Sequence, residues 1–548
     1  MQIKKILGIS LIALSTLGGC TEDFLTVTPN DQLSEATFWR NQGDVEMALA
    51  SCYHRFESYM NIAFMDTGTD NGYDKFNFWY KRLANAGLSA STNPSTIKGN
   101  WVCWHSHIWS LYKKIRVYNT FLEKVPEVEM DEKMKKQYIA EVRFLRAYDY
   151  FWKVSLFGDM PLVTKVLATD EVNTPRTPKA EIEAFILSEL AAVAPDLPEY
   201  NTIDSKGHIT RGAAYALKAR LELYMGRYED AQASAKKVID MNCFELYPDY
   251  EEMFYETSEG SNKEYILSVK HDAVNHPQRL TQMLPPPSGG GYSSIEPTYD
   301  FMMAYQTADG KYIDDPTSGF DEDKPFENRD PRLGYTMLYP GCTYRGKIFN
   351  PLDAVVDGEP NIDHFQTSKK NSCVGGMTMI KFVHEVDPSM VNNYDADLVV
   401  IRLAEMYITF AECALKTGKD KALALQYINA IRARSNMPAA SVLDERLVKY
   451  ERRIELAFEG LRYFDIKRWD MGKEVFDQKQ IYGLRRGTID ADGNVTWKGD
   501  KNDKPTAKTE GSFYKYELRK FVPERKYLAP IPQTELDRNP EMTQNEGY

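Results

Sequence analysis

The sequence predicts a mostly α-helical protein in which stacked helical hairpins carry an irregular, loop-rich lobe with a few short strands. Three observations lead to this prediction. Residues 138–163 form a helix that is apolar around most of its circumference, and two later segments repeat a helix–glycine–helix pattern. Between them lie long stretches rich in glycine, proline and aspartate that have no regular period. Helical hairpins cannot bury their apolar faces alone, so we expect them to stack on one another.

The helix within 138–163 is the centre of the predicted stack. One of its faces carries five apolar residues at helical spacing: Val142, Leu145, Tyr148, Trp152 and Leu156. Tyr150 and Val154 lie on nearly the opposite side, so the helix is expected to be buried between neighbours rather than to lie on a surface. Gly158 and Pro161 predict its end.

Further helical pairs are predicted around this centre. With the central helix they occupy about residues 38–60, 101–163, 210–240 and 398–470. The string LYMGRYEDA at Leu223–Ala231 resembles the turn of a tetratricopeptide repeat, with Gly226 between two helices, and Gly418 has the same place in a second hairpin. Irregular insertions separate the pairs at about 62–100, 242–397 and 482–516, with one short strand predicted at Glu264–Val269.

The first twenty residues predict export and lipid anchoring. Residues 1–19 combine a basic start with an apolar run that is too short to cross a bilayer, and they lead to the string LGGC. We interpret this string as a lipobox whose Cys20 is acylated, and residues 20–548 as a single domain. An ordinary signal peptide followed by a chance cysteine is the alternative. No later run is long and apolar enough for a transmembrane helix.

Composition narrows the classes of function. The net charge is −12 and there is no basic stripe, so nucleic acid is not an expected partner. Hydrophobic residues make up 43% of the chain, which is ample for a packed core, while 34 tyrosines and 8 tryptophans suggest a contact surface as well. Beyond Cys20, six cysteines are scattered without framework spacing and are expected to be buried.

No motif in the sequence predicts catalysis, a metal site or a cofactor. The string GCTYRGK at Gly341–Lys347 is close to a phosphate-binding loop but is followed by Ile348, where Ser or Thr is needed. His105 and His107 are two residues apart and do not share a helix face. Asp321–Asp323 lacks the spacing of a calcium loop and is expected to be a solvated turn. A pair of glycosidase carboxylates cannot be picked out of the sequence, because such a pair is defined by its separation in space.

Aromatic residues interleaved with polar ones predict a binding surface instead. Trp104 repeats with Ile108 and Leu111 and is expected in the core, whereas Trp79 and Trp101 lie in or beside a polar loop, where a surface platform competes with burial. Flat rings suit the C–H faces of sugars, and amide or guanidinium groups can bind pairs of hydroxyls. The candidate ligand-binding residues are Asn71, Tyr73, Trp79, Tyr80, Arg82, Asn100, Trp101, Tyr292, Tyr299 and Tyr344.

The anchoring signal and the helical segments together match the pattern of a known protein family. The chain resembles the SusD/RagB family of Bacteroidetes outer-membrane lipoproteins over nearly its whole length. The matching stretches are LGGC with its acidic Glu22 and Asp23, and five helical segments: Thr37–Leu49, Trp109–Val125, Ala140–Val163, Arg211–Ala231 and Glu451–Trp469. The resemblance implies four tetratricopeptide-like helix pairs with an irregular lobe laid over them.

The resemblance also implies a function. Members look like non-catalytic cell-surface proteins that capture oligosaccharides, or in some branches peptides, and deliver them to a SusC-like TonB-dependent transporter in the outer membrane. Their ligand residues lie in the zones that correspond here to Asp66–Trp101 and Tyr292–Tyr344. A surface glycoside hydrolase and a pure protein scaffold remain the rival hypotheses. Charged residues inside the matching helices are predicted to form structural ion pairs between stacked helices: Arg143, Arg146, Glu451, Arg452, Glu455, Arg462 and Asp465.

Overall fold

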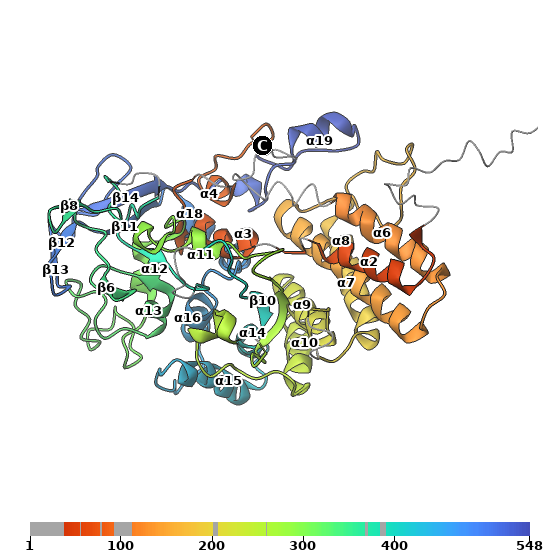
Figure 1. The fold of residues 1–548 in the computed structure, drawn as a ribbon, viewed down its shortest axis with the longest axis horizontal. Helices are drawn as coiled ribbons and strands as arrows, with labels where there is room; N and C mark the ends of the chain where they lie inside the picture. The colour runs from red at the N-terminus through yellow and green to blue at the C-terminus, as the bar shows by residue number, and fades with distance from the viewer. Residues whose placement is uncertain are drawn as a thin grey trace, which may run out of the picture.

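The computed structural model describes residues 38–54, 56–57, 59–76, 79–92, 112–200, 207–258, 260–367, 371–383 and 391–548. Within these residues a stack of long helices occupies the right and the bottom of Figure 1, and a lobe of loops and short strands occupies the left. The predicted mostly helical architecture with a loop-rich lobe is therefore confirmed.

The helical frame is a continuous stack. Helix α6 packs on α7, α7 on α8, α8 on α9, α9 on α10, α10 on α14, and α14 on both α15 and α16, while α2 covers α6 and α7. The bounds of these helices are α2 (Gln42–Tyr53), α6 (Tyr112–Lys124), α7 (Glu132–Phe157), α8 (Lys179–Val193), α9 (Arg211–Tyr224), α10 (Tyr228–Asp240), α14 (Leu403–Thr417), α15 (Lys421–Arg434) and α16 (Glu445–Glu455).

Helix α7 is enclosed as predicted. It begins after Asp131, whose carboxylate accepts a hydrogen bond from the backbone N–H of Met134 at 2.9 Å, and it ends at Gly158, whose φ of 73° favours glycine. All five residues of its predicted face are buried, and so are Tyr150 and Val154 on the other side. The burial of both faces explains why this helix is apolar around most of its circumference.

The two predicted hairpins are also confirmed. Thr210 caps α9 by accepting a hydrogen bond from the N–H of Ala213 at 3.2 Å, and Gly226 turns the chain into α10 with a φ of 73°. Gly418, with a φ of 76°, turns α14 toward α15. Because only glycine adopts these angles without strain, both turns are fixed by the sequence.

The long insertion leaves the frame at the end of α10 and returns to it at the start of α14. These two helices nevertheless pack directly on each other. The stack therefore continues across the insertion as though the two helices were consecutive, and the loop lobe is added to one side of it (Figure 1).

Two elements of the frame differ from the prediction. Helix α8 is not among the predicted helices, although Ile182, Ile186 and Leu190 recur every four residues and are buried. Residues 398–402 are not the start of a helix but strand β10 (Leu398–Arg402), which pairs antiparallel with β2 (Tyr265–Val269), the predicted strand. The run LVVIR is rich in β-branched residues, which favour a strand.

The loop lobe contains only two-stranded sheets among the residues described. They pair β1 (Gly72–Tyr73) with β3 (Glu296–Pro297), β4 (Met337–Leu338) with β9 (Thr378–Met379), β5 (Thr343–Tyr344) with β6 (Lys347–Ile348), β7 (Val355–Val356) with β8 (Glu359–Pro360), β11 (Gln480–Arg485) with β14 (Phe513–Leu518), and β12 (Gly487–Ile489) with β13 (Val495–Trp497).

Short helices complete the fold, so the insertions are less irregular than predicted. Within the first insertion lie the 3-10 helix η2 (Ala63–Gly68) and helix α4 (Trp79–Ala84). The other short helices are α3 (Tyr59–Ile62), α11 (Leu280–Met283), α12 (Tyr299–Ala304), α13 (Arg332–Thr336), α17 (Arg462–Arg468), α18 (Gly472–Phe476) and α19 (Gln533–Arg538), along with several further 3-10 turns.

A buried ion network joins the lobe to the frame. It consists of five basic side chains and five carboxylates, all almost completely buried: Arg332, Lys381, Arg402, Arg432 and Arg434 with Glu264, Asp330, Glu451, Glu455 and Glu459. Arg332 of the lobe reaches Glu451 at 2.8 Å and Glu455 at 3.1 Å on α16. Charges this deep are tolerated only when they are paired.

The other predicted ion pairs are also present. Arg143 and Arg146 of α7 both bind Glu189 of α8, at 2.7 and 2.9 Å. Arg452 binds Asp465 at 2.8 Å. Arg462 binds Asp70 at 2.7 Å, which ties the first insertion to the frame. Burial alone would raise the pKa of Asp70, but Arg453 and Arg462 together hold it well below its usual range.

Two further observations bear on the expectations above. Cys52, Cys373 and Cys413 are buried, whereas Cys243 and Cys342 are half-buried, and all five are free thiols. Cys103 lies outside the described residues. Among the helices that the structure describes, none has the length and apolar character needed to cross a membrane.

Candidate functional site

The two zones expected to carry ligand residues meet in the fold. Strand β1 of the first zone pairs with β3 of the second, with Tyr73 opposite Glu296. Thr298 continues the junction by donating its hydroxyl to the carbonyl of Asp70 at 2.5 Å and its N–H to the carbonyl of Asn71 at 3.0 Å. Segments more than 200 residues apart in the sequence therefore form one unit of the lobe.

Three of the candidate residues are interior residues, which corrects the prediction. Trp79 and Tyr80 on α4 are each 1% exposed, and Asn71 is fully buried. The Asn71 amide donates to Asp66 at 2.9 Å and its oxygen accepts from Arg453 at 2.9 Å, which holds the first insertion in place. The polar surroundings of Trp79 in sequence suggested a surface platform, but the loop folds around its own aromatic core.

Two further candidates have both ring faces covered. Tyr73 stacks on Tyr516 with ring centres 4.2 Å apart, and the Lys81 ammonium lies 4.3 Å from the ring centre of Tyr73. Because a parallel ring fills one face, the ammonium must lie on the other. Tyr299 is buried, stacks on Tyr482 at 5.4 Å and donates its hydroxyl to Glu322 at 2.5 Å. Neither ring offers a face for a sugar.

Tyr344 remains half-exposed, on a hairpin of strands β5 and β6. Arg345 and Gly346 form its turn with φ values of 52° and 70°, the pattern of a tight two-residue hairpin. The near phosphate-loop string is therefore a β-hairpin and not a loop that opens a helix.

The Tyr344 ring lies against the glycine-rich loop Pro285–Gly291. A Cβ at Gly289 would lie 2.9 Å from the ring carbon Cε1 of Tyr344, and one at Gly291 would lie 2.3 Å from the carbonyl oxygen of Pro285. Glycine is thus required at both positions for the loop to close and for the ring to rest on it. Arg345 donates to the carbonyl of Gly289 at 3.3 Å, which fixes the hairpin against the loop.

Tyr292 follows the same loop and is also half-exposed. Its hydroxyl accepts a hydrogen bond from the Gln282 amide at 3.2 Å. Tyr292, Tyr344, Gln282 and Arg345, which we call the tyrosine rim, combine aromatic rings with an amide and a guanidinium group. These are the groups expected to recognise a sugar. Of the other candidates, Arg82 is half-buried on α4, away from the rim, while Asn100 and Trp101 lie outside the described residues.

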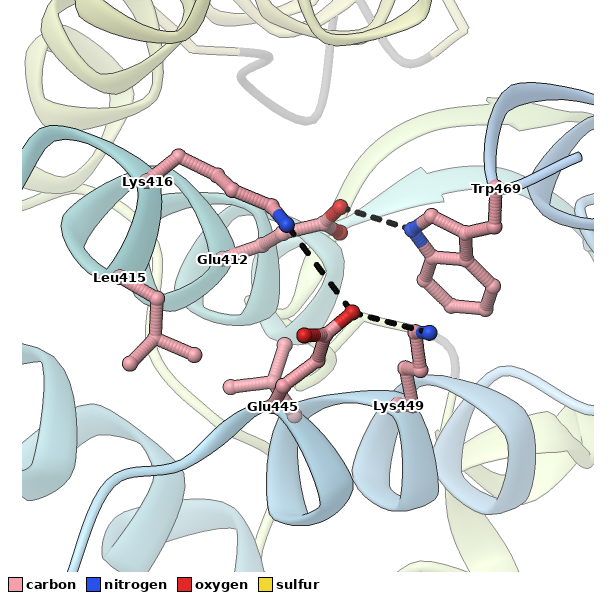
Figure 2. A pocket seen from close by; sticks show the side chains of 7 residues that line it. Glu412, Leu415, Lys416, Glu445, Lys449 and Trp469 are labelled. Carbon is pink, nitrogen blue, oxygen red and sulfur yellow. Dashed lines mark hydrogen bonds and ion pairs between the residues drawn. The ribbon is translucent and has the colours of Figure 1, made fainter.

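A smaller pocket in the frame combines an indole ring with charged groups. Figure 2 shows the indole of Trp469 hydrogen-bonded to Glu412 at 3.0 Å, with Glu445 between Lys449 at 2.9 Å and Lys416 at 3.9 Å. The cavity has a volume of about 200 Å³. The guanidinium of Arg468 lies 4.4 Å from the indole centre, so cations already cover the ring. This pocket could not be predicted from the sequence, because its residues lie in segments predicted to form the frame.

The described residues contain no group of three or more metal-ligating side chains that could hold an ion. Asp321 and Asp323 form an exposed turn in which Asp321 accepts the N–H of Asp323 at 2.9 Å, and the Asp323 carboxylate binds Arg485. The predicted acidic turn is confirmed. His105, His107 and Cys20 lie outside the described residues.

Stacked helical hairpins with a loop lobe that presents half-exposed tyrosines define a helical-repeat protein whose lobe carries a candidate binding surface. Comparison with known proteins makes this class specific. Residues 251–548 match the model of the SusD family, and residues 23–223 match a model described as starch-binding associating with outer membrane. The chain belongs to the SusD family.

Known relatives cover most of the chain. It is 26% identical over 501 residues to the starch-binding protein SusD of Bacteroides thetaiotaomicron, which covers 84% of this chain and 80% of that protein. It is 23% identical over 574 residues to a SusD-like protein of Bacteroides ovatus, covering 98% and 96%. A crystal structure of a SusD-like carbohydrate-binding protein from Bacteroides fragilis matches with a TM-score of 0.81 and 27% identity, covering 92% of this chain and all of that one.

Proposed function

We propose that this protein is a non-catalytic glycan-binding lipoprotein of the outer cell surface, which captures oligosaccharides and delivers them to a SusC-like TonB-dependent transporter. Membership of the SusD family supports the class of ligand, since relatives in that family are described as starch-binding and carbohydrate-binding. The observation that carries the proposal is the tyrosine rim, where rings and hydrogen-bonding groups are held by a glycine-rich loop. Cys20 supplies the anchor in this proposal.

Calorimetric titration with a panel of neutral oligosaccharides tests the proposal. Replacing Tyr344 by Ala should weaken binding by about 1–3 kcal/mol, the value found for an aromatic ring stacked on a base, which is roughly fivefold to 150-fold. Tyr228→Ala is the matched control, because Tyr228 is a half-buried tyrosine on α10 of the frame. Equal affinities of the two variants would refute the assignment to the rim.

Two alternatives have their own tests. A peptide-binding uptake protein of the RagB branch would bind peptides and none of the oligosaccharides in the same titrations. A surface glycoside hydrolase would release products from polysaccharides at a rate proportional to protein concentration. Delivery to a transporter is tested by co-purification with a SusC-like barrel from membranes of the native host, and recovery of the protein without a barrel would count against it.

A further inference from the structure

A large cavity lies between the helical frame and strand β2 and shares no lining residue with the tyrosine rim. Its volume is about 540 Å³, and its apolar walls come from α2, α7, β2 and the segments that follow α2 and precede α9: Leu49, Tyr53, Phe56, Tyr138, Ile209 and Val269. A second cavity of about 550 Å³ adjoins it and shares His208 and Lys270 as lining residues. Together they are large enough for a ligand of several rings.

Histidines are concentrated at this cavity. The chain has 8 histidines, of which His54, His208 and His276 line the cavity, and His271 stacks on His276 with ring centres 4.7 Å apart. Half of all the histidines are therefore at or beside one cavity.

His208 is held in a fixed orientation by groups behind it. Its Nδ1 lies 2.8 Å from the carboxylate of Glu141, which is fully buried and also accepts a hydrogen bond from the Tyr53 hydroxyl at 2.6 Å. The ring lies nearly parallel to Tyr138, at 6.4 Å between centres. Because Nδ1 is directed at Glu141, the Nε2 edge of this half-exposed ring faces away from it.

The charges around the cavity change with pH. Lys270 forms an ion pair with Asp397, whereas Glu141 is hydrogen-bonded to His208 and Tyr53. The other titratable groups around the cavity are Glu46, Asp272, His54, His271 and His276. Glu46 accepts a hydrogen bond from the Tyr138 hydroxyl at 3.3 Å. The hydrogen bond to Glu141 raises the pKa of His208, whereas burial lowers that of His271 to about 4. Mild acidification therefore adds positive charge at His208, while His271 stays neutral.

We propose that this histidine cavity is a second saccharide site and that it binds sugars bearing a carboxylate or sulfate group. That the ligand is a saccharide rests on the proposed function. The half-exposed ring of His208 can contact the C–H face of a sugar ring, while His276 and Lys270, which also line the cavity, can donate to its anionic group. Binding should strengthen as pH falls, because imidazolium donates charge-assisted hydrogen bonds that neutral imidazole cannot.

Titration calorimetry with three oligosaccharides of the same linkage tests the proposal: one carboxylated, one sulfated and one neutral. Wild-type protein should bind at least one anionic sugar more tightly than the neutral one, and more tightly near pH 5.5 than near pH 7.5. His208→Gln and His276→Gln should each weaken this binding roughly tenfold, the value of one charge-assisted hydrogen bond. His208→Gln should also remove the pH dependence, because His208 is the group whose pKa is raised. The carboxylated and sulfated arms show which anion is preferred.

His364→Gln is the matched control, because His364 lies in the loop lobe and lines neither cavity. If His208→Gln loses its helical circular dichroism, His276→Gln decides, since His276 is exposed. Affinities of the His208 and His276 variants equal to that of the control, or equal binding of anionic and neutral sugars, would overturn the proposal. If the wild-type protein binds the neutral sugar alone, this inference is overturned and the proposed function still stands. If it binds none of the three sugars, both are overturned.

Discussion

Replacing Glu455 by Gln removes one charge from the buried ion network and changes almost nothing in shape. The Glu455 carboxylate binds three guanidinium groups: Arg402 at 2.6 Å, Arg332 at 3.1 Å and Arg434. It is fully buried, and although burial alone would raise its pKa, these arginines hold the pKa far below its usual range. The wild-type network balances five positive and five negative charges, so the variant leaves one buried positive charge without compensation.

The cost follows from that imbalance. Removing one partner of a buried ion pair typically destabilises a protein by about 3–5 kcal/mol, because the remaining charge cannot return to water. The total free energy of unfolding of a domain is about 5–15 kcal/mol, so the loss is a large fraction of it. Since Arg332 belongs to the loop lobe and Glu455 to the frame, we expect the lobe to loosen first and to become more sensitive to protease.

Urea unfolding followed by circular dichroism measures the effect. The control is Glu229→Gln, because Glu229 pairs with Lys419 on the surface, where both side chains are largely exposed. Such a pair contributes about 0–1 kcal/mol. If Glu455→Gln lowers the free energy of unfolding by no more than the control does, the network does not hold the lobe and the reasoning is refuted.

Three further predictions follow from individual residues. Burial would raise the pKa of Glu412, but Arg468 lowers this pKa to about 2. The ionised carboxylate therefore adds stability that is complete above about pH 4.5 and is lost as pH falls toward 2. In urea unfolding at several pH values, the difference in stability between wild type and Glu412→Gln should shrink over that range, and a constant difference would contradict the prediction. Gly375→Ala should lower the free energy of unfolding by about 1–3 kcal/mol, because a Cβ there would lie 1.7 Å from the Tyr516 hydroxyl. Gly334→Ala is the control, because its Cβ meets nothing within 4 Å and the melting temperature should stay almost unchanged. Equal melting temperatures of the two variants would refute this prediction. Cys20→Ala should leave the chain unprocessed and absent from the washed membrane fraction, and wild-type retention in immunoblots would disprove the anchor.

The helical frame could be predicted from the sequence because its signals are local. The face of α7 and the glycine turns at Gly226 and Gly418 each depend on residues within a few helical turns, and all are confirmed. The prediction that Glu455 pairs with a neighbouring helix is also confirmed, through Arg434 of α15, whereas Arg462 pairs with Asp70 of the first insertion and not with a helix. Their partners Arg332 and Asp70 could not be predicted, because they lie in insertions more than a hundred residues away.

The loop lobe was harder to predict, because polar composition does not distinguish an exposed loop from one that folds around its own core. Trp79 illustrates this, since it lies in a stretch with several glycine, asparagine and aspartate residues and yet it is 1% exposed. Tyr73 and Tyr299 show a second difficulty, because what covers a ring depends on Tyr516, Tyr482 and Lys81, which only the fold brings near. Whether the rim binds sugars remains a prediction.

The direct packing of α10 on α14 has a consequence for how such proteins diversify. The two ends of the long insertion are held side by side by α10 and α14, which pack directly on each other, so the insertion begins and ends at one fixed place on the frame. The length and composition of this insertion can change without shifting the helices, provided that residues equivalent to Arg332 and Lys381 still reach the frame carboxylates Glu455 and Glu459. One scaffold can thereby display many unrelated recognition surfaces, and transplanting residues 241–397 between relatives should move ligand preference with them.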